Sequence, residues 1–303
     1  MPGAELHLPA GSAAEGGDPV VVTPESAGWA LCGLRVVRLG PGETRTVSTG
    51  PDELAVLPLS GGGATVEADG RTFELEGRSS VFARVTDWAY VPRDSRLTLS
   101  SAAGCELALA SARATRRLEP AYVEASSVPV EVRGAGPATR QVTNFLTPGA
   151  FDGADKLICC ELLTPDGNWS SYPPHKHDDT EGSPVWNEEI YYFRIGRAGT
   201  VDYAAEGYGF HRTYTHDGSI DATVTVRDGD VFLVPRGYHG PCVAAPGYPM
   251  YYLNVMAGPA PGRTFAFVDD PPHAWIRQSW AALEPDPRVP LTDAEGAVWT
   301  RSG

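Results

Sequence analysis

ELAVLPLSGGG at residues 53–63 and EIYYFRIGRAG at residues 189–199 follow one plan, in which an acidic residue opens an apolar run that ends in a glycine-rich turn. Apolar runs of this length, bounded by turn residues, predict β-strands. In both places a glycine and a second apolar run follow, and then the tripeptide Val-Pro-Arg at residues 91–93 and 234–236. The sequence therefore predicts two similar β-rich units that differ mainly in loop length.

The composition agrees with two folded units. The chain has 303 residues, 42% of them hydrophobic, and its 34 glycines and 27 prolines are spread along the whole length. Such a chain can bury two ordinary cores, with many tight turns between short strands. Residues 126–149 are rich in proline and glycine, with an alternating run at Val128, Val130 and Val132. This pattern predicts a linker and an extra strand, and it places the boundary between units 1–125 and 126–303.

The net negative charge of the chain argues against some classes of binding partner. The formal net charge is -14 and the sequence pI is about 4.9. Nucleic acids and acidic membranes attract basic surfaces, so neither is an expected partner. No apolar run approaches the length of a membrane span, and the first 30 residues lack the pattern of a secretion signal. We expect a cytoplasmic protein. Its five cysteines, without C-x-x-C spacing, indicate neither a disulfide framework nor a cysteine zinc site.

Four residues of the second unit have the spacing of a metal site. His175 and His177 are two apart, so on a strand they project from the same face. The loop 178–187 is expected to act as a hairpin that places His177 and Glu189 on neighbouring strands. Glu188 would then face the other way, as a solvated carboxylate. His239 follows a Pro-Arg-Gly turn and supplies a third imidazole.

These four residues, three imidazoles and one carboxylate, suit one divalent ion from the set Zn, Mn, Fe, Ni and Co, and they require no organic cofactor. An alternative is that the histidine pair only flanks a solvated loop, because Asp178 and Asp179 follow it directly. The convergence of four residues favours the metal site. The first unit has no histidine between His7 and His175, so the metal is expected only in the second unit.

Several motifs resemble a known family. The H-x-H, Glu and His pattern resembles the cupin signature, and PPHKHD at 173–178, EEIYYF at 188–193 and VPRGYH at 234–239 resemble the 5-deoxy-glucuronate isomerases of myo-inositol catabolism. The resemblance extends to residues 133–142 and covers nearly the whole chain. It implies an all-β fold of two cupin-like double-stranded β-helix (jelly-roll) barrels in tandem, with the metal only in the C-terminal barrel. The family's ligands carry over to His175, His177, Glu189 and His239.

The resemblance implies an aldose-ketose isomerisation that converts 5-deoxy-glucuronate to 5-dehydro-2-deoxy-gluconate. The reaction passes through an enediolate, whose negative charge a divalent metal stabilises. A side chain must also move the proton between two carbons. The candidates by sequence proximity are Lys176, Glu181, Tyr191 and Tyr238, and of these Lys176 is the one for which a merely solvated side chain is favoured.

An anionic substrate requires local positive charge in this acidic protein, and arginine binds both oxygens of a carboxylate. The candidates are Arg133, Arg140, Arg194 and Arg212. Arg212 is the first choice because it lies in a strand-like stretch of the second unit. Tyr252 and Asn254 share one face of the strand predicted at residues 251–256, where they could bind a sugar or form core.

Other readings of the same residues stay open. A related ketol-isomerase acting on a hexosulose uronate would share the metal pattern, and a cupin dioxygenase would use iron at a similar site. A sugar-binding cupin without catalysis is a further alternative, although no DNA-reading segment is evident. Exposed sheet edges favour a homo-oligomer of open size, with a small uronic acid as the other partner.

Overall fold

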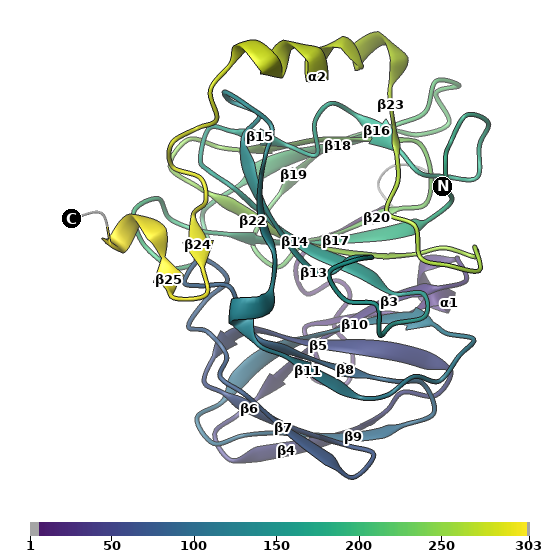
Figure 1. The fold of residues 1–303 in the computed structure, drawn as a ribbon, viewed down its shortest axis with the longest axis vertical. Helices are drawn as coiled ribbons and strands as arrows, with labels where there is room; N and C mark the ends of the chain where they lie inside the picture. Colours follow the sequence, from purple (N-terminus) through teal and green to yellow (C-terminus); the bar gives the residue numbers. More distant parts are fainter. Residues whose placement is uncertain (1–5, 302–303) are drawn as a thin grey trace.

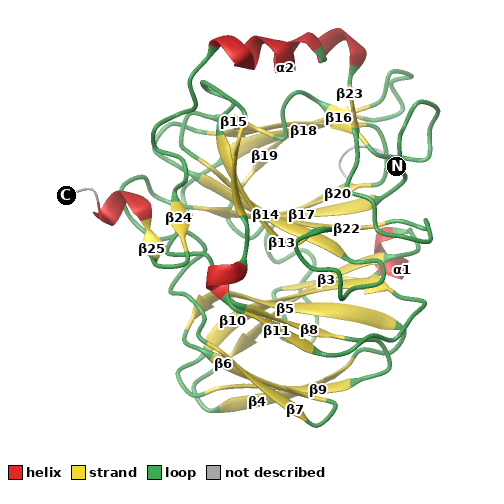
Figure 2. Cartoon of the chain, in the orientation of Figure 1, coloured by secondary structure: helices red, strands yellow, loops and turns green. Residues whose placement is uncertain are grey.

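A computed structural model describes residues 6–301, and β-strands dominate it (Figures 1 and 2). Four sheets are stacked along the long axis of the molecule. Two sheets belong to the first half of the chain and lie in the lower part of Figure 1, and two belong mainly to the second half. Each half closes into a barrel-like sandwich, and the two inner sheets pack face to face. The predicted all-β fold of two cupin-like barrels is thus confirmed.

The N-terminal barrel consists of two antiparallel sheets. Its inner sheet has the order β11 (Ala121–Val123), β8 (Trp88–Val91), β5 (Asp52–Gly61), β10 (Cys105–Arg113), β3 (Cys32–Leu39) and β2 (Val20–Val22). Its outer sheet has the order β4 (Glu43–Ser48), β9 (Arg96–Ser101), β6 (Ala64–Ala68) and β7 (Arg71–Leu75).

The C-terminal barrel repeats this plan with a larger inner sheet of seven strands. Its inner sheet has the order β1 (His7–Leu8), β20 (Val231–Val234), β17 (Glu188–Ile195), β22 (Met250–Ala257), β14 (Ile158–Thr164), β13 (Arg140–Leu146) and β12 (Val130–Arg133). Its outer sheet has the order β19 (Asp221–Val226), β18 (Gly209–Tyr214), β21 (Tyr238–Ala244), β16 (His175–Lys176) and β23 (Val268–Asp269), with β15 (Trp169–Ser170) also paired to β21.

Helices are few and short. They are α1 (Pro24–Ala27), α2 (Trp275–Ser279) and the 3-10 turns η2 (Ala125–Ser127), η3 (Pro271–His273), η4 (Trp280–Ala282) and η5 (Val298–Arg301), and a small hairpin pairs β24 (Thr292–Asp293) with β25 (Gly296–Ala297). The η3-α2-η4 segment lies across the C-terminal barrel at the top of Figure 1. From residue 6 to residue 301, no helix has the length and apolar character needed to cross a membrane.

Strand periodicity divides the buried side chains into three layers. On β5, Leu54 and Val56 pack inside the N-terminal barrel, whereas Ala55 and Leu57 face the other barrel. On β17, Tyr191 packs inside the C-terminal barrel and its neighbours Ile190 and Tyr192 face the N-terminal one. The layer between the barrels buries several large side chains, among them Trp88 and Tyr251. Each such side chain contributes about 1.5–3 kcal/mol to stability, so the two barrels stabilise one another.

Two buried carboxylates connect the barrels in opposite directions. Glu188 of β17 accepts hydrogen bonds from the backbone N–H groups of Ala30, Leu31 and Cys32, at 2.8, 2.8 and 2.9 Å. Glu53 of β5 accepts the N–H groups of residues 155–157 in the other barrel, at 2.6–2.8 Å. The expectation of a solvated Glu188 was therefore wrong, because its acceptor atoms satisfy a turn of the N-terminal barrel.

The same pair corrects the alignment of the two halves. Glu53 and Glu188 both lie on the strand face that meets the other barrel, so Glu53 corresponds to Glu188 and not to Glu189. The residue that corresponds to Glu189 is Leu54, which pairs with Val91 as Glu189 pairs with Val234. An apolar residue thus occupies the inward position in the N-terminal barrel.

The boundary between the units has a simple structural setting. β11 ends at residue 123, and the strand predicted around Val130 exists as β12 at the edge of the C-terminal inner sheet. β1, near the start of the chain, pairs with β20 of that same sheet. The N-terminal segment therefore lies on the second barrel, and the division at residue 125 stays a prediction for the rest of the chain.

Candidate metal centre

Three of the predicted ligands meet across the interior of the C-terminal barrel. Glu189 projects inward from β17 of the inner sheet, whereas His239 lies on β21 of the outer sheet and His177 directly follows β16. The prediction that a hairpin sets His177 and Glu189 on neighbouring strands was wrong, because β16 and β17 belong to different sheets. The loop 178–187 instead crosses from one sheet to the other.

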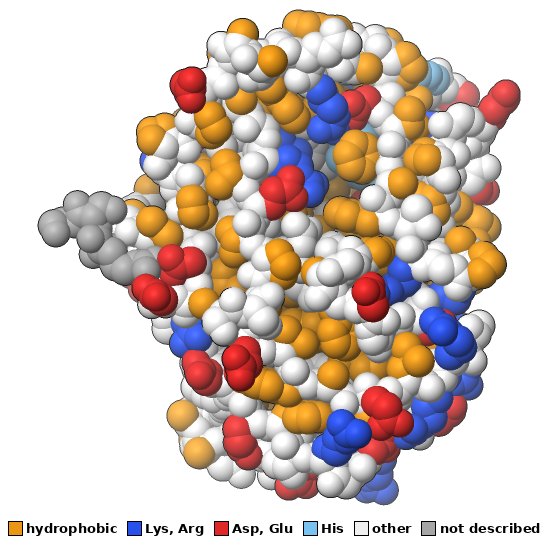
Figure 3. Space-filling view, in the orientation of Figure 1, with side chains coloured by type: hydrophobic (Ala, Val, Ile, Leu, Met, Phe, Trp, Pro, Cys, Tyr) orange, Lys and Arg blue, Asp and Glu red, His pale blue; other side chains and the backbone are white. Residues whose placement is uncertain are grey.

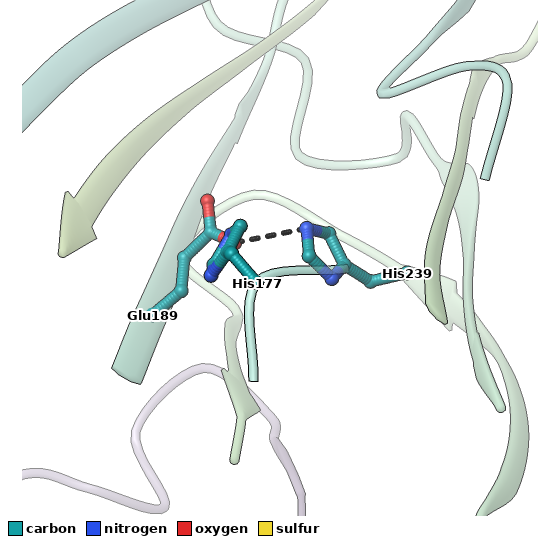
Figure 4. A group of neighbouring side chains, drawn as sticks. All are labelled: His177, Glu189 and His239. Atoms are coloured by element: carbon teal, nitrogen blue, oxygen red, sulfur yellow. Dashed lines mark hydrogen bonds and ion pairs between the residues drawn. The ribbon is translucent and has the colours of Figure 1, made fainter. Parts of the chain in front are cut away.

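The geometry of these three side chains is that of a ligand set. One carboxylate oxygen, Glu189 Oε2, lies 3.1 Å from Nε2 of His177 and 3.1 Å from Nε2 of His239. One ligand atom from each residue lies within 4.8 Å of the other two, and all three residues are buried. Figure 4 shows the carboxylate and the two imidazoles directed toward one another. Among residues 6–301, no other group of three His, Cys, Asp or Glu side chains has this arrangement.

The backbone fixes which imidazole nitrogen is free. His177 Nδ1 lies 3.1 Å from the carbonyl oxygen of Asn187, and His239 Nδ1 lies 3.4 Å from that of Gly237. A carbonyl oxygen only accepts, so Nδ1 carries the proton in each neutral ring and Nε2 presents its lone pair to the cluster. His239 Nε2 has no hydrogen-bond partner although it is buried. Two lone pairs facing a carboxylate form a site that a cation would complete.

The charge state of the cluster suits a metal. Burial opposes ionisation of Glu189, but the nearby His239 and His177 outweigh it and hold the pKa of the carboxyl far below its usual range. Burial also opposes a charge on His177, but the protonated ring donates from Nε2 to Glu189, and this hydrogen bond and the negative charge of Glu189 raise the pKa of the imidazole. Glu189 is therefore an ionised carboxylate at neutral pH. Asn254 orients it by donating from Nδ2 to Oε1 at 2.6 Å.

His175 lies beside this cluster without being part of it. It pairs with His239 across β16 and β21, and the ring centroids of the two residues are 4.5 Å apart. Its Nδ1 lies 3.1 Å from the carbonyl oxygen of Pro173, so its Nε2 is also unprotonated when the ring is neutral. Burial and the neighbouring His239 and His177 lower its pKa well below the usual value. His175 as a fourth ligand stays a prediction.

A narrow cavity adjoins the cluster, and hydroxyl groups line one side of it. Tyr191 and Ser171 both contribute to the wall, and their hydroxyl oxygens are 3.0 Å apart. Ser171 has a φ of 48°, a left-handed conformation that is uncommon for a residue other than glycine. Backbone strain of this kind is found where surrounding structure fixes a functional side chain. Tyr191 is buried, and burial raises the pKa of its phenol well above the usual value.

The other proton-transfer candidates lie elsewhere. Lys176 projects away from the cavity and is buried, which corrects the expectation of a solvated lysine. Its ammonium group donates to the Glu181 carbonyl at 3.0 Å and lies 5.4 Å from the Tyr238 ring centre. Glu181 is an exposed residue of the loop between β16 and β17, and Tyr238 packs against His216. None of these three lines the cavity.

Of the four candidate arginines, the one favoured by the sequence does not line the cavity, and two others do. Arg212 points outward from β18, is exposed, and pairs with Asp221 at 3.4 Å, because its neighbours His211 and Thr213 take the inward positions. Arg194 lies between the barrels, where it forms ion pairs with Glu106 and Asp228. Neither residue reaches the cavity, whereas Arg133 and Arg140 both line it.

The strand at 250–257 also divides its candidates. Asn254 lines the cavity and its Oδ1 has no hydrogen-bond partner, although the atom is buried. Tyr252 is fully buried deeper in the barrel, where it stacks on Tyr191 and donates to Ser170 at 2.9 Å. Asn254 is therefore placed to meet a ligand, whereas Tyr252 supports Tyr191 from behind.

The C-terminal segment contributes residues that the sequence patterns did not single out. Phe265, Phe267 and Arg277 complete the wall of the cavity. β23 of this segment pairs with β16, so the segment is attached to the strand that carries His175. These residues lie about 100 positions after the histidine pair, in a stretch without strand periodicity. The aromatic residues around Arg277 were the one available signal.

Comparisons with known proteins find relatives over most of the chain. The KduI/IolB family model matches residues 7–276. A Geobacillus kaustophilus protein named 5-deoxy-glucuronate isomerase is 41% identical over 92% of this chain and 98% of its own length. A Bacillus subtilis protein of the same name is 36% identical over 84% of this chain and 91% of its own length.

Solved structures share the fold of this chain. An IolB-like protein from Salmonella typhimurium matches with a TM-score of 0.80 and 33% identity, over 89% of this chain and 98% of its own. The oxalate decarboxylase of Lactobacillus farciminis matches with a TM-score of 0.60 over 87% of this chain and 88% of its own. At 13% identity, the second likeness shows the fold alone.

Proposed function

We infer that this chain, which belongs to the KduI/IolB family, is an aldose-ketose isomerase that converts 5-deoxy-glucuronate to 5-dehydro-2-deoxy-gluconate with one divalent metal ion. Relatives named for this activity align with most of the chain. The observation that carries the proposal is the buried convergence of His177, Glu189 and His239 beside a cavity. A role in myo-inositol catabolism follows from the family resemblance.

The donor set fits a divalent cation. Two imidazole Nε2 atoms and one ionised carboxylate converge, and each imidazole is oriented by a backbone carbonyl. Zn, Mn, Fe, Ni and Co all accept such ligands. When bound, the cation would supply a positive charge that stabilises the enediolate. His175, adjacent to the cluster, is proposed as the fourth ligand.

Tyr191 is the proposed proton donor to a substrate oxygen. Of the four candidates it is the one that lines the cavity, and Ser171 holds its hydroxyl at 3.0 Å. Because burial raises its pKa, the phenol keeps its proton at neutral pH. Tyr191 would therefore donate a proton or hydrogen bond to a substrate oxygen while the C2 proton moves to C1.

The reaction itself is a balanced isomerisation. The proton on C2 moves to C1, the C2 hydroxyl loses its proton and becomes the ketone, the aldehyde oxygen gains a proton and becomes a hydroxyl, and no electron acceptor is consumed. Burial of the cluster keeps bulk water away from the enediolate. Neither molecular oxygen nor an organic cofactor enters this scheme.

The experiment that tests the proposal is turnover of 5-deoxy-glucuronate, followed by NMR, under air and under nitrogen. The isomerase predicts equal rates in both, whereas a dioxygenase would need oxygen. A related isomerase would show a larger kcat/KM for a hexosulose uronate, so that compound is the second substrate. Absence of turnover with the metal-loaded protein would contradict the proposal. The cytoplasmic location and homo-oligomeric state stay predictions.

A further inference from the structure

Three guanidinium groups line the cavity next to the metal ligands. They belong to Arg133 and Arg140 at the edge of the inner sheet and to Arg277 of α2. Figure 3 shows basic side chains gathered in a hollow beneath the α2 segment, with pale blue histidine atoms visible beside them. One end of the cavity therefore carries positive charge, in a protein whose formal net charge is -14.

Two of these three charges are neutralised within the protein. Arg133 binds both carboxylate oxygens of Glu131, at 2.8 and 2.7 Å. Arg277 binds both oxygens of Asp269. In each of these pairs the guanidinium binds both oxygens of the carboxylate. Glu131 and Asp269 therefore have little capacity left to pair with a second arginine.

Arg140 has no such partner. Its Nη1 donates to the carbonyl oxygen of Ala138 at 3.0 Å, and its Nη2 donates to that of Tyr172 at 3.3 Å. Its Nε is buried without any hydrogen-bond partner, and within residues 6–301 no carboxylate forms an ion pair with it. Only 3% of the residue is exposed, so bulk solvent stabilises its charge little.

An unpaired buried charge is unfavourable unless a ligand completes it. Burial, with the like charges of Arg133 and Arg277 nearby, lowers the pKa of Arg140 to about 10. The group is still positive at neutral pH. Its Cζ lies over the Trp280 ring, 5.6 Å from the ring centre, so the C-terminal segment contributes a cation-π contact to it.

We propose that Arg140 is the residue that binds the substrate carboxylate, through its Nε and a neighbouring Nη group, while the reacting carbons lie at the His177-Glu189-His239 cluster. This inference rests on the proposed isomerase function, in which the acid group and the aldehyde are at opposite ends of the substrate. A planar carboxylate matches two parallel N–H groups of one guanidinium.

Asn254 supplies a second contact for the substrate, beside the metal cluster. Its Oδ1 is the unpartnered acceptor in the cavity wall, and its Nδ2 is already bound to the metal ligand Glu189. An acceptor beside the cluster suits a substrate hydroxyl, which donates. The cavity thus has an unsatisfied donor at Arg140 and an unsatisfied acceptor at Asn254, which together select a hydroxylated acid in one orientation.

The test compares two substrates with the metal-loaded enzyme. One is 5-deoxy-glucuronate, and the other is its neutral analogue, in which a hydroxymethyl group replaces the carboxylate. Arg140→Met is expected to lower kcat/KM for the acid about 100-fold and to change that for the neutral analogue less than about threefold. Arg140→Lys, which keeps the charge without the fork, is expected to lose about 10-fold for the acid alone.

The matched control is Arg197→Met, since Arg197 is an exposed arginine of the same barrel that pairs with Glu206. Arg197→Met is expected to leave kcat/KM unchanged for both substrates. Arg212→Met tests the arginine that the sequence favoured. If this variant lowered kcat/KM for the acid but not for the neutral analogue, the proposal would be overturned. Equal losses for acid and neutral analogue in Arg140→Lys would also overturn it, because they would indicate a purely structural role.

Calorimetric binding of glucuronate and glucose separates this inference from the proposed function. If the wild type fails to isomerise 5-deoxy-glucuronate but binds glucuronate in preference to glucose, and Arg140→Lys loses that preference, the carboxylate site stands and the isomerase does not. If the wild type isomerises the acid and Arg140→Lys keeps its full preference for acids, the function stands and the carboxylate site does not. Circular dichroism of each variant identifies any that fail to fold.

Discussion

Glu188 and Glu189 are neighbours on one strand, and replacing each with glutamine should affect different properties. In Glu188→Gln, one oxygen of the side chain keeps accepting, but an amide NH2 replaces the oxygen that receives two backbone donors, Leu31 N–H and Cys32 N–H. Each buried donor left without an acceptor costs about 1–3 kcal/mol. The free energy of unfolding should therefore fall by about 2–6 kcal/mol.

The assay is thermal and urea unfolding in the presence of a chelator, so that metal binding does not contribute. At about 2 °C per kcal/mol for a chain of this size, Tm should fall by about 4–12 °C. Metal content after reconstitution should equal that of the wild type, because Glu188 faces the N-terminal barrel. Glu189→Gln is the matched variant, and it should lose the metal because it removes the one anionic ligand.

This reasoning would be refuted if the two substitutions had each other's effects. If Glu188→Gln unfolds within about 1 °C of the wild type and loses its metal, while Glu189→Gln keeps the metal, the two faces of β17 have been assigned the wrong way round. Glu53→Gln gives an independent check, since Glu53 serves residues 155–157 in the same way. It should destabilise the protein without any change in metal content.

Three further predictions follow from single residues. Tyr191→Phe should keep the metal and lower kcat about 100-fold, as steady-state kinetics would show, and an unchanged kcat would exclude Tyr191 as the proton donor to the substrate oxygen. His177→Ala should abolish metal binding in elemental analysis, whereas His175→Ala should weaken it if His175 is the fourth ligand, and full affinity in His175→Ala would remove that residue from the set. Burial lowers the pKa of His211 to about 3, so on acidification the unfolded chain takes up a proton that the folded chain does not. The free energy of unfolding should therefore fall by about 1.4 kcal/mol per pH unit below pH 6.5. Between pH 7 and 5, urea unfolding should show that the metal-free wild type loses about 2 kcal/mol more than His211→Gln. Equal losses in the two proteins would show that His211 does not cause the effect.

Strand periodicity explains most of what the sequence predicted correctly. Glu189 and Tyr191 share an inward face because they are two apart, and the turn before His239 places that residue near the start of a strand. The duplicated segments at 53–63 and 189–199 became equivalent central strands, β5 and β17. Local pattern was sufficient in these cases because the information lies within a few residues.

The errors come from contacts that are distant in sequence. Periodicity shows that Glu188 and Glu189 face opposite ways, but not that an entire barrel covers Glu188, whose partners are about 157 positions away. The loop 178–187 is compatible with a hairpin or with a crossing between sheets, and only the barrel closure decides. Arg212 would have been placed outward had buried His211 been recognised as the inward residue of β18.

The most direct test of the isomerase is NMR of 5-deoxy-glucuronate in deuterated water, with enzyme stripped by a chelator and with the same enzyme after metal is restored. The restored enzyme should convert the aldehyde to 5-dehydro-2-deoxy-gluconate, and the stripped enzyme should not. Conversion at an equal rate without metal, or no conversion by fully loaded enzyme, would contradict a metal-dependent isomerase at His177, Glu189 and His239.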